Sequence, residues 1–387
     1  MAAELSLLIP ENGGNIVWVQ YAFGDFIGWV NAFNNVASNI SSLACLAVLF
    51  VDYLPVELSA ANQWAIKVAF SIANTLLNIG GPRWISRISV VLLVFVLSPF
   101  FVEIALVIID HKLNINALKT IPPTYDIHWG LFLSTVIWSY GGFDNIGALA
   151  GEVKGGRPTF IKGIIGSFPL IFMNYFWPIF VGYSIDTRYQ DWTSGFFTPL
   201  AYKLHRWLGV WMVVASAVSN FGQFNAGFAP LARGIWAMAK AEGTAQKLPK
   251  ILAWSWRRHT GTIRPIAAIV FTGVITLAVT ALPFNILVQI FLMIRIVNLV
   301  CEYAALIKLR YSHADVPRSF VVPGGMVVAW VLGLPTLALA VFSLINSDWQ
   351  VWAAGAVVNA ITLIAYGLKK LYERSCTKPS TSYASIQ

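Results

Sequence analysis

The sequence predicts an all-α integral membrane protein, and three observations support this fold class. Only 11% of the 387 residues are charged, whereas soluble domains carry about 25%. Hydrophobic residues make up 57% of the chain, and the mean hydropathy is +0.68. The apolar runs, such as 327–345 with no charged residue, are continuous rather than alternating, which favours membrane-spanning helices over a β-barrel.

A helix needs about 20 apolar residues to cross a hydrocarbon core about 30 Å thick. The segment at residues 2–9 is therefore too short to cross. Residues 1–370 are predicted to form one transmembrane domain, which is followed by a disordered cytoplasmic tail at 371–387. About ten full spans are predicted, at residues 24–51, 63–80, 87–109, 128–150, 161–184, 207–231, 265–282, 285–307, 327–346 and 350–368.

Lysine and arginine residues predict the orientation, because they are enriched in cytoplasmic loops. If the predicted loop at 10–23 is cytoplasmic, 19 of these 26 residues lie on the cytoplasmic side, six lie outside and Arg295 lies within a span. Both termini are then cytoplasmic, and we expect a multi-pass protein of the plasma membrane. Because the net charge of +9 follows this distribution, we expect the lipid bilayer and no nucleic acid as a partner.

The span predicted at 128–150 contains the stretch WSYGGFDN, which signals a break. Each glycine weakens a helix by about 1 kcal/mol, and a carboxylate in hydrocarbon is expensive. Backbone groups freed at such a break bind substrates and ions, and aromatic rings suit an ammonium group. Alternatively, the glycines only allow close helix packing, and Asp144 caps the helix that resumes. The predicted substrate-binding residues at the break are Trp138, Tyr140, Gly141, Gly142, Phe143, Asp144 and Asn145.

Two further spans carry polar side chains at mid-membrane depth. Asn39 and Ser42 belong to the span at 24–51, and Asn220 and Gln223 belong to the span at 207–231. The spacing of the second pair places both side chains near one helix face. We expect all four residues to line the substrate pathway, although hydrogen bonds between helices are the alternative use of such groups.

Four charged residues inside predicted spans are expected to be functional. Glu103, Glu302 and Asp144 are candidates for carrying a coupling proton, because a desolvated carboxylate binds its proton more tightly. Arg295 lies two helical turns before Glu302, and we expect the two side chains to share a face without touching. Arg295 could instead neutralise Asp144, which would suit zwitterionic substrates.

The sequence contains no catalytic, cofactor or metal motif that we recognise. The five histidines and three cysteines lack ligand or nucleophile spacing. GEVKGGRPT, at 151–159, has Arg157 and Pro158 where a phosphate loop requires Lys followed by Ser or Thr. The N-terminus has no basic segment, so we expect no signal peptide. We therefore predict that the protein is not an enzyme and needs no cofactor or metal.

Several stretches resemble the amino acid–polyamine–organocation superfamily, and within it the polyamine and cationic amino acid transporters of plants and trypanosomatid protists. They include PENGG followed by Trp18, FDNIGALAGEVKGGRPTFIKGI, LVCEYAALIKLR and PRSFVVPGG. The resemblance implies a five-plus-five inverted repeat with two extra helices that acts as a secondary transporter, usually coupled to protons. By comparison with that pattern, the chain lacks the first helix and most of the second.

The resemblance also assigns roles to particular positions. Trp138 and Tyr140 match substrate-stacking aromatic positions, Asp144 matches an acid that recognises cations or protons, and Glu302 matches an acid near the inner end of its helix. The polyamine transporters of plants carry acids where this chain has Ser42 and Phe291. We predict a secondary transporter, coupled to protons, for polyamines or cationic amino acids. The alternatives are a neutral amino acid permease and an inactive truncated or accessory form.

Overall fold

The computed structural model describes residues 1–9, 14–80, 83–110, 114, 116, 127–142, 156–188, 192–193, 195–240, 248–257, 263–316 and 320–376. These residues are mostly helical. The α-helices are α1 (Ala2–Leu8), α2 (Asn15–Phe23), α3 (Asp25–Asp52), α4 (Ala60–Gly80), α5 (Arg83–Ile109), α6 (Trp129–Tyr140), α7 (Gly156–Ile185), α8 (Phe197–Leu204), α9 (Arg206–Lys240), α10 (Ile266–Val279), α11 (Phe284–Ser312), α12 (Gly325–Ile345) and α13 (Trp349–Cys376).

Each of the ten predicted spans overlaps a helix, namely α3 to α7 and α9 to α13, and residues 143–150 of the fourth span lie outside the described residues. Six of these are both long and apolar enough to cross a membrane: α3, α5, α7, α11, α12 and α13. The apolar helix α10 is shorter, with 14 residues, and α6 has 12. Within the described part of the chain, the strands are the two-residue β1 (Trp256–Arg257) and β2 (Ile263–Arg264), so the all-α fold class is confirmed. The arrangement of these helices as two inverted repeats stays a prediction.

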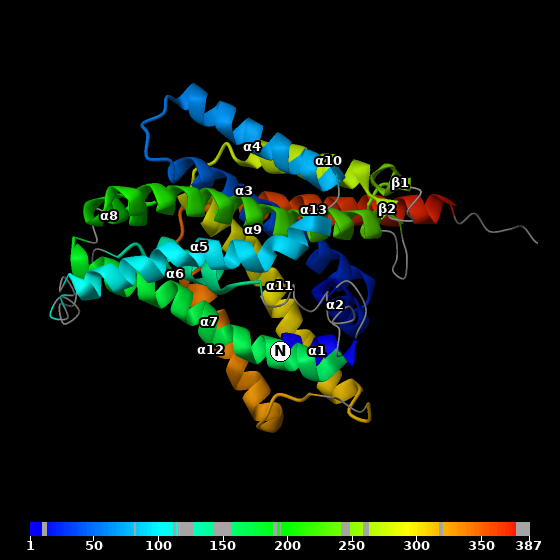
Figure 1. The fold of residues 1–387 in the computed structure, drawn as a ribbon. Helices are drawn as coiled ribbons and strands as arrows, with labels where there is room; N and C mark the ends of the chain where they lie inside the picture. Colours follow the sequence, from blue (N-terminus) through cyan, green and yellow to red (C-terminus); the bar gives the residue numbers. More distant parts are fainter. Residues whose placement is uncertain are drawn as a thin grey trace, which may run out of the picture.

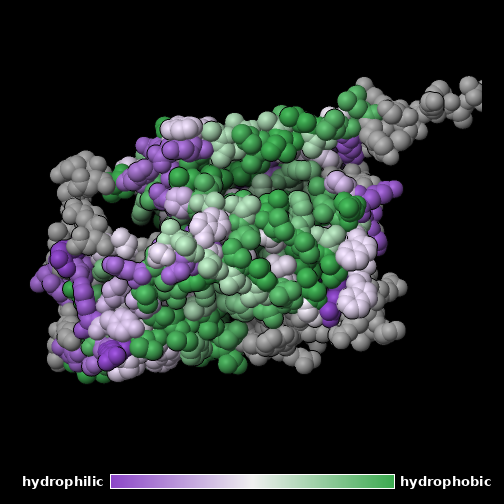
Figure 2. All heavy atoms as spheres, turned by 90° about the horizontal axis from the view of Figure 1, so that it is seen from above, coloured by the Kyte–Doolittle hydropathy of each residue, from purple (hydrophilic) through white to green (hydrophobic). Residues whose placement is uncertain are grey.

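The helices form a bundle in which α3 packs against α2, α9, α11 and α13. Helices α4 and α10 lie side by side along one edge of this bundle (Figure 1). Figure 2 shows that hydrophobic residues cover the middle of one face and that hydrophilic residues gather toward two opposite ends. This distribution is the one expected for a protein whose apolar belt contacts lipid chains.

Two segments differ from the prediction. The predicted loop at 10–23 is wrong as a loop, because Asn15 to Phe23 form α2, which buries Trp18, Val19 and Ala22 against α11. Buried positions at this spacing are what an amphipathic helix presents to its neighbour. At the other end of the chain, α13 continues to Cys376 and so includes residues 371–376, which were predicted to belong to the disordered tail. Residues 377–387 lie outside the described residues, so the disorder predicted for them stays a prediction.

Asparagine side chains connect α4 to α9. The amide nitrogen of Asn225, on α9, donates to the amide oxygen of Asn74 on α4, and Asn78 donates to Asn225 over 2.8 Å. All three side chains are buried, with exposed fractions of 6% or less. Between membrane helices, such hydrogen bonds supply association energy that apolar contact with lipid-like side chains does not.

Candidate functional site

The span predicted at 128–150 contains the end of helix α6, at the residues where the break was predicted. Helix α6 ends at Tyr140, Gly141 has an extended conformation with φ −77° and ψ 176°, and Gly142 has φ +93°. A β-carbon at Gly141 would lie 2.8 Å from the carbonyl oxygen of Ile137, and L residues rarely adopt the φ of Gly142. Both positions therefore favour glycine. Phe143, Asp144 and Asn145 lie outside the described residues.

A cavity of about 270 Å³ opens beside this interruption. We call it the break cavity. It is formed by the end of α6 together with α7 and α9. Its described lining residues are Ser139, Tyr140, Gly141, Gly142, Ile171, Asn174, Tyr175 and Gln223. None of these residues carries a formal charge, and five of them have hydroxyl or amide groups that can hydrogen-bond an amine or a carboxylate.

Two tyrosines form the aromatic part of the break cavity. The ring centroids of Tyr140 and Tyr175 lie 4.9 Å apart with a tilt of 51° between the ring planes. Aromatic rings at this separation stabilise one another, and their faces can attract a cation. Tyr175 was not among the predicted site residues, because its position at the cavity depends on how α7 packs against α6. The available signal was the polar pair Asn174 and Tyr175 within an apolar span.

Trp138 does not line the break cavity, although it lies on the last turn of α6. Its indole nitrogen donates to the hydroxyl of Ser42 on α3 over 2.9 Å. Its ring also packs edge-on against Phe284, with centroids 5.8 Å apart. The structure thus brings together two predicted site residues, Trp138 and Ser42, in a contact that holds α6 against α3.

The other predicted polar residues divide between the cavity and the helix backbone. Gln223 lines the break cavity and donates to Ser219 over 3.3 Å. Asn220, which is buried, donates to the carbonyl of Ser216 on its own helix. Asn39 likewise donates to the carbonyl of Asn35, one turn earlier on α3. Among these polar candidates, Gln223 is therefore the one that the structure places beside the break.

The expectation that Arg295 and Glu302 do not touch is wrong. An Nη2 atom of Arg295 lies 3.4 Å from Oε1 of Glu302, and the amide of Asn15 on α2 donates to the same oxygen over 2.8 Å. The long arginine side chain extends along α11 and covers the two turns between them. We call these three residues the α11 polar cluster. Glu302 is fully buried and Arg295 is 7% exposed, so the pair is held away from water.

A second buried ion pair lies at the end of α11. The Nε atom of Arg310 donates to Glu4 of α1 over 2.9 Å, and Nη1 donates to the carbonyl of Gly325 over 2.6 Å. The carboxylate of Glu4 also accepts from the backbone N–H of Val322. This network joins α1, the end of α11 and the segment before α12.

Glu103, the remaining acidic candidate, has a different environment. It lies on α5 with an exposed fraction of 1%, and its Oε1 atom has no hydrogen-bond partner among the described residues. The residues one turn before and one turn after it, Phe100 and Leu106, pack against α8 and α9. Glu103 is therefore remote in sequence from the break and surrounded by apolar neighbours.

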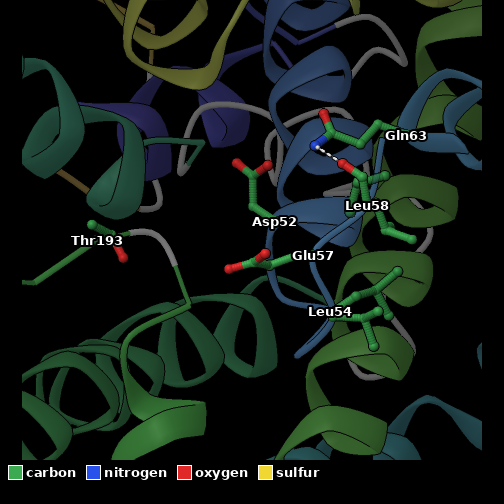
Figure 3. Close-up of a pocket in the computed structure, with 8 residues that line it drawn as sticks. Asp52, Leu54, Glu57, Leu58, Gln63 and Thr193 are labelled. Carbon is green, nitrogen blue, oxygen red and sulfur yellow. Dashed lines mark hydrogen bonds between the residues drawn. The ribbon is translucent and has the colours of Figure 1, made fainter. Parts of the chain in front are cut away.

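A larger cavity, of about 480 Å³, lies between the end of α3 and the start of α4. Figure 3 shows the carboxylates of Asp52 and Glu57 directed into the same space, opposite Thr193. Gln63 lines it as well and donates to the carbonyl of Leu58 over 3.2 Å. Its two acids give this cavity a negative character that the break cavity lacks among its described lining residues.

The described residues include no group of three or more histidine, cysteine or acidic side chains that could hold a metal ion. Nor do the break cavity and the two ion pairs contain a nucleophile next to a base. The arrangement suits noncovalent binding by rings, amides and free backbone groups.

Comparisons with known proteins place this geometry in context. A family model described as amino acid permease matches residues 1–366. A probable polyamine transporter of Arabidopsis thaliana is 28% identical over 387 residues, covering 97% of this chain and 74% of the relative. The polyamine transporter PUT1 of rice, Oryza sativa subsp. japonica, is 30% identical, covering 89% of this chain and 66% of the relative. The Arabidopsis polyamine transporter RMV1 is 26% identical, covering 99% and 78%.

Proposed function

The chain belongs to the amino acid permease family, and from this premise we propose that it is a secondary transporter of polyamines or cationic amino acids that binds its substrate at the α6 break. Membership confirms the predicted resemblance, the membrane transporter fold and the prediction that the protein is not an enzyme. The substrate class is supported by the relatives, three of which are named as polyamine transporters or probable ones.

The observation that carries the proposal is the end of α6 at Gly141 and Gly142, next to a cavity bordered by tyrosine rings. Interrupted membrane helices leave backbone carbonyl and N–H groups that bind substrates and ions. The α6 C-terminus also presents the negative end of its helix dipole, which favours a cation. A protonated amine can meet carbonyl oxygens, amide oxygens and ring faces in the same small volume.

We propose that Asp144, two residues beyond Gly142, supplies the carboxylate that selects cations. Phe143 and Asn145 complete the segment in this proposal. Trp138 and Ser42 act by holding α6 against α3, as their hydrogen bond supports. Asn39 and Asn220 are proposed to line the pathway away from the break. Alternating access then follows from rocking of one group of helices against the other.

The neutral amino acid alternative depended on Arg295 as a counter-ion for Asp144. In the structure Arg295 has an acidic partner, Glu302, on its own helix. That contact favours a cationic substrate, because it provides another role for the arginine. The proposal has four further parts, which the lysine and arginine distribution or the resemblance supports. They are the location in the plasma membrane, the cytoplasmic termini, the single domain at 1–370 and the coupling to protons.

Uptake by purified protein in lipid vesicles tests the proposal. We expect uptake of radiolabelled putrescine or arginine, and little uptake of leucine. Asp144→Asn should lower uptake of the cation by about tenfold or more, since a desolvated charge pair contributes well over 1.4 kcal/mol to binding. Asp348→Asn, a change of an exposed acid, is the matched control and should leave uptake unchanged.

Three results would contradict the proposal. Uptake of leucine in preference to both cations would support the neutral permease, and full activity of Asp144→Asn would remove the carboxylate from recognition. No uptake of any of the three substrates by the folded protein would support the accessory or inactive form.

A further inference from the structure

Glu103 is the buried acid for which the described part of the structure offers no partner. Its side chain is 1% exposed, and Oε1 accepts no hydrogen bond there. Few of the neighbouring residues are buried, since only 17% of the apolar window of α5 is buried inside the protein. Glu103 therefore lies on the narrow face by which α5 contacts the rest of the bundle.

The surroundings of Glu103 on this face are apolar. Phe100 and Leu106 pack against Ala201, Leu208 and Met212, and Val107 is completely buried. Helices α7, α8 and α9 are the elements packed against α5. Their charged and titratable residues are Arg157, Lys162, Tyr175 and Tyr183 on α7, Tyr202 and Lys203 on α8, and Arg206, Arg233 and Lys240 on α9.

No hydrogen bond or ion pair joins Glu103 to a described side chain of that set. Lys203 lies 2.8 Å from Asp186, an acid that also binds Arg188. Arg206, at the start of α9, is exposed. On α5 itself, the backbone positions of Arg87 and Arg83 lie more than four and more than five turns before Glu103. The described structure thus supplies no cation to balance an ionised Glu103.

Glu302 provides the contrast. It is equally buried, but it has Arg295 and the amide of Asn15 within contact distance. An ionised carboxylate is tolerated in such a site, because charge and hydrogen bonds compensate for the lost water. An ionised carboxylate without partners in an apolar site is so unfavourable that the group takes up a proton instead.

We propose that Glu103 is the proton-binding residue of the transporter, and that its protonation is linked to the packing of α5 against α9. The proposal rests on the proposed transport function and selects one acid from the three candidates. The neutral carboxyl fits the packed arrangement. Release of the proton requires water to reach Glu103, which requires α5 to move away from α9.

A local feature of α5 permits such a movement. Pro99, one turn before Glu103, lacks the N–H that would bond to the carbonyl of Phe95. The hydroxyl of Ser98 donates to that carbonyl over 2.6 Å in its place. The helix can therefore change its direction next to Glu103 without breaking a backbone hydrogen bond there.

The test compares transport with and without a proton gradient in reconstituted vesicles. For Glu103→Gln, we expect gradient-driven uptake of putrescine or arginine to fall by about tenfold, and exchange of external for internal substrate without a gradient to change by less than about twofold. The control is Asp348→Asn, which likewise replaces a carboxylate by an amide, but at an exposed position, and it should alter neither rate. If the glutamine variant does not fold, Glu103→Met, of similar length, replaces it.

Gradient-driven uptake equal to that of the wild type would overturn the proposal, as would an equal loss of uptake and exchange in a folded variant. If the wild-type protein transports neither cation, the proposed function fails but the proton site is still tested. The thermal unfolding midpoint of the wild type should then fall relative to that of Glu103→Gln as the pH rises from about 6 to about 9, because ionisation opposes the packed state. Parallel curves would overturn the proton site.

Discussion

The α11 polar cluster and the break cavity are two polar regions of one membrane protein, and they are built in opposite ways. In the cluster, Glu302 has two contacting partners and no exposed surface. At the break, a helix ends at a glycine pair, and the described side chains that line a cavity of about 270 Å³ are uncharged. The first region fixes how helices pack, whereas the second leaves hydrogen-bonding groups available to a ligand.

The difference teaches that burial of charge alone does not mark a binding site. A charge that already has its partners, as Glu302 and Arg310 do, contributes to the specificity of packing. A binding site instead needs groups whose partners arrive with the substrate. If this distinction holds, a change in the buried ion pair of Glu4 and Arg310 should affect stability, and changes at the break cavity should affect transport.

The largest effect is expected from Glu4→Ala. This change leaves the buried Arg310 without its carboxylate, and breaking one partner of a buried pair costs about 3–5 kcal/mol. The thermal unfolding midpoint should fall by several degrees, while the KM of the remaining folded protein stays the same. Asp25→Ala removes an exposed acid and serves as the control, with little expected change. A similar midpoint for both variants would show that the ion pair does not hold α1 in place.

An intermediate effect on stability, with a strong effect on transport, is expected from Gly142→Ala. A side chain at φ +93° costs about 1–2 kcal/mol, and the strain falls on the segment that we propose to bind substrate. Initial uptake should therefore fall by about tenfold. Gly163→Ala, on α7, meets no atom within 4 Å and should not lower uptake. Equal uptake by both variants would separate the break from substrate binding.

The smallest effect is expected from Tyr175. Replacing it by alanine removes a ring face next to Tyr140 and should raise the KM for a cationic substrate about threefold to tenfold, in line with about 0.5–1.5 kcal/mol for an aromatic contact. Tyr175→Phe keeps the ring and should stay close to the wild type. If phenylalanine has the larger effect, the hydroxyl rather than the ring contacts the substrate.

Local signals in the sequence predicted the helices and the end of α6 near Gly141, because apolar length and glycine placement act over a few residues. The orientation and the resumption of the helix beyond the break stay predictions. The contact between Arg295 and Glu302 was not predicted, because the spacing of backbone positions does not include the length of an arginine side chain. The position of Tyr175 beside Tyr140 was not predicted either, because it results from the packing of α7 against α6. Asp144 was selected from the local pattern, and its role stays a prediction.

The asparagines that connect α4 to α9 have a practical consequence for work with the isolated protein. Their hydrogen bonds are formed between amides and do not depend on the chain length of the surrounding amphiphile. Contacts made by apolar side chains alone compete with detergent tails of similar chemistry. During extraction, α4 and α9 should consequently stay associated in short-chain detergents that detach more weakly held helices, such as the mostly exposed α7.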